Sequence, residues 1–194
     1  MSCGIGLYAV YGTMGAGKTN FVVNNLLKDT KYQKVISNIK FTDEFIKSLP
    51  NIEFITYDKY DVLSVIASVN PNNPNSFIII DECQLILQNK QSKITKDFMN
   101  ACTRIRQDNQ VVILITQSSE FLPSGLLDII YQSFKLTSQK QKAKSLEKIS
   151  ILETFQGGID YNTKLIDKSI YKLVYGNYET SNFEATEKPK ILLG

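Results

Sequence analysis

Short apolar runs alternate with helix-like segments along most of this 194-residue chain. The apolar runs predict β-strands at residues 5–11, 34–39, 52–56, 77–82 and 110–115. Apolar residues at helical spacing predict helices at residues 20–28, 42–49, 59–69, 94–107 and 126–131. Apolar strands that alternate with helices are typical of a sheet covered on both faces. The pattern therefore predicts an α/β fold with a mostly parallel central sheet and helices on both sides.

The last third of the chain follows a different pattern. Residues 148–155 and 169–175 look like strands, and we expect them to pair near the edge of the sheet as a C-terminal β extension. Residues 135–150 lack apolar periodicity and predict an exposed loop or hairpin tip. A chain of this length has room for one ordinary α/β core, so we expect one domain at 1–180 and a loosely held tail at 181–194.

A phosphate-binding motif follows the first predicted strand. It fits the pattern G-x-x-x-x-G-K-[ST] and consists of Gly12, Thr13, Met14, Gly15, Ala16, Gly17, Lys18 and Thr19. Its glycines allow a tight turn whose N–H groups point inward, Lys18 can reach the β- and γ-phosphates, and the Thr19 hydroxyl can bind Mg²⁺. A strand before the motif and a helix after it are the flanks that such a loop needs. The sequence therefore predicts a nucleoside triphosphate site.

Two carboxylates end the apolar strand at 77–82. The carboxyl ends of parallel strands share one edge of a sheet, so Asp81 should lie near the phosphate loop. Asp81 would bind Mg²⁺ through water, and Glu82 would polarise the attacking water. Gln117 follows another apolar strand and could sense the γ-phosphate or place the water, although a helix cap or turn residue is an equal alternative.

Composition adds two observations. Arg104 and Arg106 are the only arginines, and the other twenty cations are lysines. Because only arginine offers a planar bidentate fork, the pair is a candidate for phosphate contact; the alternative is surface ion pairing near a helix C-terminus. Residues 135–150 carry five lysines against one glutamate. Within this segment Lys140, Lys142 and Lys144 form a basic cluster, for which a solvated loop is one interpretation.

Several classes of protein lack support in the sequence. Without histidine, and with three cysteines not spaced as C-x-x-C, the chain has almost nothing with which to build a zinc site. No apolar run approaches the ~20 residues of a membrane helix, so we expect an intracellular protein without a membrane span. The guanine motif N-K-x-D, the transporter signature L-S-G-G-Q and the arginine-rich lid of small-molecule kinases are all absent. ATP hydrolysis is therefore favoured by elimination as well as by Glu82.

Taken together, these segments resemble the Zot-like ATPases, the cytoplasmic domains of filamentous-phage assembly proteins. That family lies within the FtsK–HerA translocases and viral packaging ATPases. The resemblance covers most of residues 5–180 in order. It rests on the phosphate loop, on residues 35–39, on 78–84, on the arginine before the strand that ends at Gln117, and on 170–175.

The resemblance implies a RecA-like core, ATP with Mg²⁺, and a homo-oligomeric ring, with a hexamer expected. Such a ring would move double- or single-stranded viral DNA during virion assembly. It would act in the host cytoplasm, or be held to a virion or membrane by a capsid or membrane docking partner. Because a ring repeats the basic cluster around its channel, Lys140, Lys142 and Lys144 would then be candidates for DNA contact. Arg106, with Arg104 as second choice, matches the family's arginine. Zot-like proteins generally carry a membrane helix after this domain, and none precedes Gly194. Either the chain is an isolated domain or it packages DNA into a capsid instead of extruding it through a membrane.

Two alternatives to a viral DNA motor remain. One is a nucleotide-controlled assembly factor that binds a capsid or membrane partner and does not translocate DNA. The other is a plasmid or conjugation DNA translocase, which shares the chemistry and differs in its biological setting.

Overall fold

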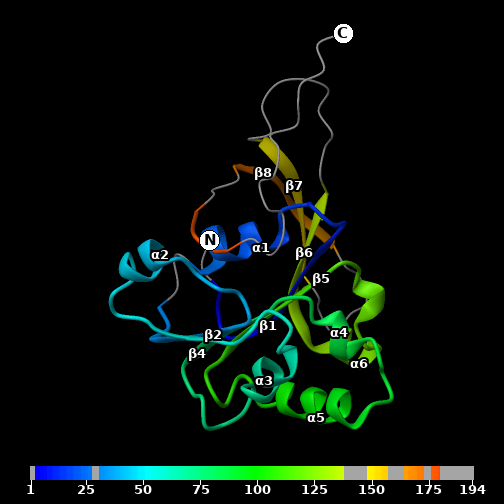
Figure 1. Cartoon of the computed structure of the whole chain (residues 1–194). Coiled ribbons are helices and arrows are strands. Elements are labelled where there is room, and N and C mark those ends of the chain that lie inside the picture. Colours follow the sequence, from blue (N-terminus) through cyan, green and yellow to red (C-terminus); the bar gives the residue numbers. More distant parts are fainter. Residues whose placement is uncertain (1–2, 28–30, 138–147, 157–163, 173–175, 180–194) are drawn as a thin grey trace.

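The computed structural model describes residues 3–27, 31–137, 148–156, 164–172 and 176–179. Within these ranges eight strands form one sheet in the order β3-β2-β4-β5-β1-β6-β7-β8 (Figure 1). The strands are β1 (Gly6–Gly12), β2 (Lys34–Ser37), β3 (Glu53–Thr56), β4 (Ser76–Ile80), β5 (Val111–Thr116), β6 (Ile130–Thr137), β7 (Lys148–Gln156) and β8 (Lys164–Lys172). Neighbours from β3 to β6 are parallel, and β7 and β8 are antiparallel. The expected parallel sheet with a C-terminal β extension is confirmed.

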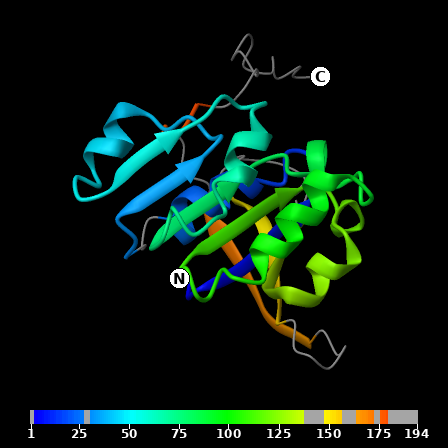
Figure 2. The same cartoon turned by 90° about the horizontal axis from the view of Figure 1, so that it is seen from below.

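Helices cover both faces of the parallel strands. They are α1 (Lys18–Phe21), continued by the π-helix η1 (Val22–Leu27), then α2 (Asp43–Lys47), α3 (Val62–Ala67), α4 (Gln84–Leu87), α5 (Lys93–Cys102), the 3₁₀ helix η2 (Ser119–Phe121) and α6 (Ser124–Ile129). In Figure 1, α1 and α2 lie on one side of the sheet and α3 to α6 on the other. Figure 2 views the strands from the side of α3 and α5.

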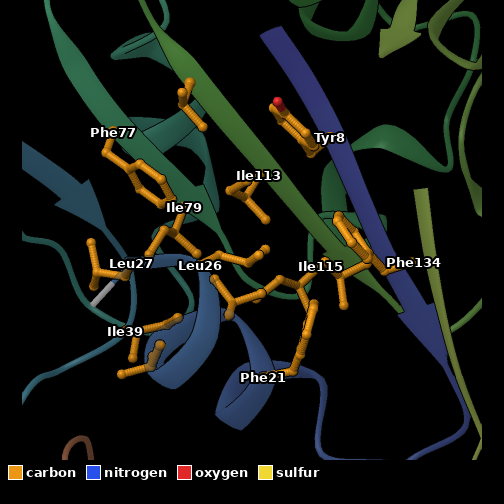
Figure 3. Close-up of a cluster of buried hydrophobic side chains, with 14 of the residues drawn as sticks. Tyr8, Phe21, Leu26, Leu27, Ile39, Phe77, Ile79, Ile113, Ile115 and Phe134 are labelled. Atoms are coloured by element: carbon orange, nitrogen blue, oxygen red, sulfur yellow. The ribbon is translucent and has the colours of Figure 1, made fainter. Parts of the chain in front are cut away.

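Each face of the sheet has its own apolar core. Tyr8 and Val10 of β1 pack with α1 and η1, where Phe21 and Leu26 are buried (Figure 3). Leu7 and Ala9 of the same strand belong to a second core with α3, α5 and α6. Because successive side chains of a strand point to opposite faces, both sets must be apolar. This explains why the central strands appear in the sequence as continuous apolar runs instead of alternating ones.

The order of the central strands sets which loops meet. β5 lies between β1 and β4, with Tyr11 of β1 opposite Thr116 and Ile80 of β4 opposite Leu114. All three strands run in the same direction, so their carboxyl ends share one edge, which we call the carboxyl edge. The residues that follow β1, β4 and β5 are therefore gathered there.

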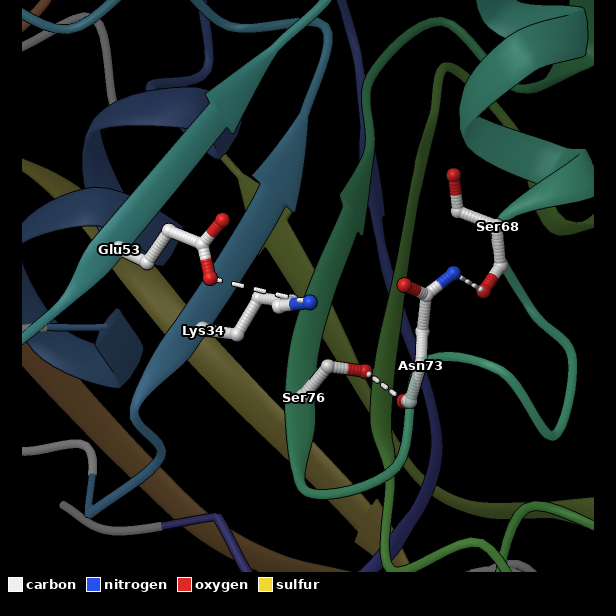
Figure 4. A network of polar contacts seen from close by, with 5 residues as sticks. All are labelled: Lys34, Glu53, Ser68, Asn73 and Ser76. Carbon is white, nitrogen blue, oxygen red and sulfur yellow. Dashed lines mark hydrogen bonds and ion pairs between the residues drawn. The ribbon is translucent and has the colours of Figure 1, made fainter.

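Polar contacts fix the opposite edge, which we call the amino edge (Figure 4). Lys34, at the start of β2, pairs with Glu53, at the start of β3, at 3.7 Å. The Ser76 hydroxyl donates to the Asn73 carbonyl at 2.7 Å, and the Asn73 side-chain amide donates to the Ser68 carbonyl at 3.0 Å. The loop before β4 is thereby bound both to the strand it enters and to the end of α3.

Several predicted elements differ from the structure. The strand predicted at 169–175 begins earlier, since β8 spans Lys164–Lys172. The helix predicted at 94–107 ends at Cys102, and residues 103–109 form turns, because buried Ile105 must pack into the core as the chain reverses into β5. The helix predicted at 126–131 ends at Ile129. The loop predicted at 135–150 was placed too early, since β6 continues to Thr137. Backbone pairing of β6 with β1 and β7, together with burial of Leu136, makes residues 135–137 part of this strand.

Candidate functional site

The phosphate loop leaves β1 at the carboxyl edge and turns directly into α1. A Cβ at Gly12 would lie 2.2 Å from the Leu136 carbonyl oxygen, so the close approach of β6 requires glycine at this position. Gly17, which caps α1, has a left-handed φ of 79° that favours glycine. Between them Thr13, Met14 and Gly15 form the exposed tip of the loop, and Ala16 is buried.

Lys18 folds back across this loop. Its ammonium donates to the Gly12 carbonyl at 2.9 Å and to the Thr13 carbonyl at 3.1 Å. Burial lowers the pKa of Lys18, and the carboxylates of Glu82 and Asp81 act in the opposite direction. A partly buried cation thus lies at the loop that would hold the phosphates, facing the two acids at the end of β4.

The hydroxyl of Thr19 connects the phosphate loop to β4. It donates to Asp81 Oδ2 at 3.1 Å, although the two residues are 62 positions apart in the sequence. Burial, with a further contribution from Glu82, raises the pKa of Asp81 to about 6, while Thr19 and Lys18 act in the opposite direction. The expected proximity of Asp81 and the loop is present in the structure.

Glu82 lies in a constrained turn after β4. Its φ of 53° is in the left-handed region, which is uncommon for a residue with a side chain. Its N–H donates to Asp81 Oδ1 at 3.0 Å, and the Gln84 side-chain amide donates to its carboxylate. The next N–H, of Cys83, donates to the Ile115 carbonyl of β5 at 3.1 Å. Backbone and side chain together hold the Glu82 carboxylate at the carboxyl edge.

These residues fit a nucleotide with its magnesium ion. The open loop tip, where a Cβ at Gly15 would meet no atom within 4 Å, leaves space beside the N–H groups of the loop. Thr19 and Asp81 supply oxygen ligands of the kind that Mg²⁺ prefers, and Mg²⁺ commonly uses one or two protein carboxylates together with phosphates and waters. In the described part of the chain no group of three or more His, Cys, Asp or Glu residues forms a separate metal cluster.

Gln117 and the arginines lie at opposite edges of the sheet. Gln117 follows Thr116 at the carboxyl edge, between the phosphate loop and the Asp81–Glu82 turn, and is exposed. Arg104 and Arg106 precede β5 and are therefore at the amino edge. β5 spans six residues, or about 20 Å, so neither arginine reaches the phosphate loop of its own chain.

Both arginines are exposed, and among the described residues neither guanidinium forms a hydrogen bond or ion pair. The alternative interpretation, that the arginines form surface ion pairs, therefore has no support in that part of the chain. The turn itself is fixed, because the side-chain amide of Gln110 donates to the carbonyls of Asn70 and Asn73 at 3.0 and 2.8 Å. Lys140, Lys142 and Lys144 lie outside the described residues.

Sequence reasoning assigned no role to two polar residues near the site, Asn38 and Gln84. Asn38 is buried and hydrogen-bonds the backbone of Asp81. Gln84 is buried and holds Glu82. A signal for Asn38 was present, since it lies near the carboxyl end of the strand predicted at 34–39 and therefore belongs to the same edge as the phosphate loop. No spacing rule indicated Gln84.

Solved structures share this fold at low sequence identity. The N-terminal domain of zonular occludens toxin from Neisseria meningitidis is 20% identical, with a TM-score of 0.58 over 91% of this chain and 100% of that one. The genome packaging NTPase B204 of Sulfolobus turreted icosahedral virus 2, solved with ATP-gammaS, is 14% identical, with a TM-score of 0.56 over 88% and 98%. The flagellar accessory protein FlaH from Methanocaldococcus jannaschii is 14% identical, with a TM-score of 0.56 over 89% and 91%. The RecA-like P-loop NTPase fold is thus confirmed.

Sequence comparison identifies the family. No curated protein sequence matches the chain. Of the helices in the described ranges, none is long and apolar enough to cross a membrane. The family model for zonular occludens toxin (Zot) matches residues 6–180, which include the phosphate loop, the Asp81–Glu82 turn and the strand that ends before Gln117. The resemblance to Zot-like proteins is confirmed, and the chain belongs to the zonular occludens toxin (Zot) family.

Proposed function

We propose that the chain is a Mg²⁺-dependent ATPase that works as a homo-oligomeric ring and moves viral DNA during virion assembly. One observation carries the enzymatic part of this proposal. Lys18 and Thr19 of the phosphate loop lie with Asp81 and Glu82, which directly follow β4, at one edge of the sheet, linked by the hydrogen bond between Thr19 and Asp81. Hydrolysis of a nucleoside triphosphate needs a loop that binds the phosphates, ligands for the metal ion and a carboxylate beside them, and this edge of the sheet provides all three.

Each residue has a distinct role in the proposed reaction. The N–H groups of the loop and the Lys18 ammonium bind the β- and γ-phosphates. Thr19 and Asp81 would hold Mg²⁺, which would neutralise part of the negative charge on the phosphates. Glu82 accepts a proton from the attacking water, and Gln117, at the end of the strand between β1 and β4, orients that water or senses the γ-phosphate.

The position of the arginines supports a ring. Arg104 and Arg106 lie at the amino edge, opposite the nucleotide site of their own chain, and both are exposed. A neighbouring copy that presents its amino edge to this carboxyl edge would bring Arg106 to the γ-phosphate. An arginine supplied in this way is worth about 10³- to 10⁵-fold in rate. The proposed site is therefore shared between two subunits.

The assignment to DNA rests on the family and on charge. The Zot family model matches residues 6–180, which contain the phosphate loop and the Asp81–Glu82 turn. The structural neighbour B204 is a viral genome packaging NTPase. The lysines at positions 140, 142 and 144 would add contacts from every subunit of a ring, so that weak single contacts become strong together. Neutralising all three should abolish stimulation of the ATPase by DNA, and unchanged stimulation would remove this segment from the proposal.

The test is an ATPase assay across protein concentrations, with and without double-stranded DNA. We expect specific activity to rise with protein concentration as rings form, and to rise further with DNA. Activity independent of protein concentration would contradict the shared site. Slow hydrolysis that ignores DNA would instead favour the nucleotide-controlled assembly factor. Absence of hydrolysis and of nucleotide binding would overturn the enzymatic proposal itself.

A further inference from the structure

A buried asparagine extends the sheet beside the proposed metal ligand. Asn38 directly follows β2, and β2 pairs with β4 only as far as Ser37 opposite Ile79. The residue is 2% exposed, although a polar amide loses solvation when buried. A buried amide is expected to have hydrogen-bond partners, and those of Asn38 show what it does.

The partners of Asn38 are backbone groups of Asp81 and Lys59. Its Oδ1 accepts from the Asp81 N–H at 2.8 Å, and its Nδ2 donates to the Asp81 carbonyl at 2.9 Å. The same Nδ2 donates to the Lys59 carbonyl at 2.8 Å. Both hydrogens of the amide and one lone pair of its oxygen are used. The side chain therefore takes the place of a further strand residue beside Asp81.

This arrangement fixes Asp81 where the ladder of β4 has ended. Without Asn38, the N–H and carbonyl of Asp81 would lose these bonds, and the backbone that carries its carboxylate would be free to move. That carboxylate lies 3.1 Å from the Thr19 hydroxyl, and the N–H of Glu82 binds its other oxygen. A shift of Asp81 would thus change the spacing between the two proposed metal ligands.

We propose that Asn38 is a positioning residue for Asp81 and sets the affinity of the site for the magnesium ion that accompanies the nucleotide. This inference rests on the proposed function. Few other residues can do the same task, because it needs a donor and an acceptor on one short, planar side chain. Leucine has similar volume and neither group, and aspartate has no donor.

The experiment compares wild type with Asn38→Leu in binding a fluorescent, non-hydrolysable ATP analogue. Titration with Mg²⁺ at fixed analogue gives the apparent Mg²⁺ affinity, and titration of the analogue in EDTA gives binding to the loop alone. We expect the variant to lose about 10- to 100-fold in Mg²⁺ affinity, the usual effect of removing a group that orients a metal ligand. Binding in EDTA should change by less than about twofold, because the loop itself is untouched.

Gln110→Leu is the matched control. Gln110 is also a fully buried amide that donates to two backbone carbonyls, but it does so at the amino edge. We expect Gln110→Leu to lower the thermal stability to an extent similar to Asn38→Leu and to leave the Mg²⁺ affinity unchanged. Asn38→Ser, which is smaller and cannot overpack, provides a second variant if Asn38→Leu does not fold.

The outcomes distinguish a failure of the proposed function from a failure of the proposed role of Asn38. If the wild type binds no analogue, the proposed function fails. If the wild type binds it and Asn38→Leu keeps wild-type Mg²⁺ affinity, the role of Asn38 is refuted while the proposed function stands. The role is also refuted if both Asn38 variants fail to fold while Gln110→Leu folds, or if Gln110→Leu weakens Mg²⁺ binding equally.

Discussion

The first glycine of the phosphate loop is fixed by its neighbour strand and not by the nucleotide alone. A Cβ at Gly12 would meet the Leu136 carbonyl oxygen at 2.2 Å, whereas a Cβ at Gly15 would meet no atom within 4 Å. Backbone on β6 cannot move aside as a flexible side chain could. Gly12 is therefore required by the nearby backbone of β6, whereas Gly15 is favoured only by its own φ angle.

Gly12→Ala should consequently destabilise the fold far more than Gly15→Ala. We expect a loss of more than about 3 kcal/mol for Gly12→Ala, since the clash is with backbone. Gly15→Ala should cost about 1 to 2 kcal/mol, because its φ of 74° disfavours a side chain but the space is open. Urea unfolding of both variants measures the difference. Equal losses would show that β6 does not constrain the loop.

A second prediction at the residue scale concerns pH. Burial raises the pKa of Asp81 from 3.8 to about 6. Between these values the folded protein holds a proton that the unfolded chain has released, so this group makes the metal-free protein more stable as the pH falls through 6 and less stable as it rises. Asp81→Asn keeps the shape of the side chain and cannot titrate.

Thermal unfolding in EDTA from about pH 7 to about pH 4 should therefore show the wild type gaining stability relative to Asp81→Asn. The gain should be at most about 3 kcal/mol, the equivalent of a shift near two pKa units. Comparing the two proteins cancels the titration of groups that do not interact with Asp81. Parallel pH profiles would show that Asp81 is not the group responsible.

At the scale of elements, the sheet separates the proposed site into two halves. The turns after β1, β4 and β5 meet at the carboxyl edge, and the turn that carries the arginines lies at the amino edge. Gln110 and the loop at 70–75 hold the arginine turn in place. The rigid turn presents two guanidinium groups outward, with no partner among the described residues.

Arg106→Ala should abolish most hydrolysis while ATP binding remains. We expect a fall in kcat of about 10³-fold or more, because the lost guanidinium would act on the transition state and not on the ground state. Arg104→Ala is the matched control, because Arg104 is two positions earlier in the same turn and is also exposed, and this variant should keep most activity. If the two variants exchange behaviour, Arg104 is the acting residue. Wild-type turnover in both would remove the arginines from catalysis.

At the scale of the whole molecule, the proposed active site needs two copies of the chain. Lys18→Ala removes the cation of the phosphate loop, and such a loss of a preorganised charge costs about 10²- to 10³-fold or more in rate. Arg106→Ala leaves that loop intact and removes the contribution to a neighbour. Each variant alone should be inactive for a different reason.

Mixing Lys18→Ala with Arg106→Ala should therefore restore hydrolysis. In a mixed ring, an Arg106→Ala subunit has an intact phosphate loop and can receive the arginine of a Lys18→Ala neighbour. Activity should be greatest near equal proportions of the two variants and absent in either pure sample. A mixture that stays inactive, although size exclusion shows that the variants assemble together, would mean that Arg106 acts within its own chain or not at all.

Much of this molecule could be predicted from local pattern. The central strands were found because strands buried on both faces must be apolar throughout, as the two cores on either side of β1 show. The phosphate loop was found because its glycines and Lys18 have a fixed spacing. β6 was missed, because its alternating buried residues Phe134 and Leu136 form too short a run to predict a strand by themselves, and its pairing with β1 and β7 joins distant segments.

The sequence by itself determined the fold class, the phosphate loop and the acids at Asp81 and Glu82, because each depends on residues close together in the chain. Only the tertiary structure decided that β5 separates β1 from β4, that Asn38 holds Asp81 across 43 positions, and that the arginines lie at the edge opposite their own site. These depend on strand order and on hydrogen bonds between distant segments. No local pattern encodes them, because the energy that fixes them comes from packing the whole sheet.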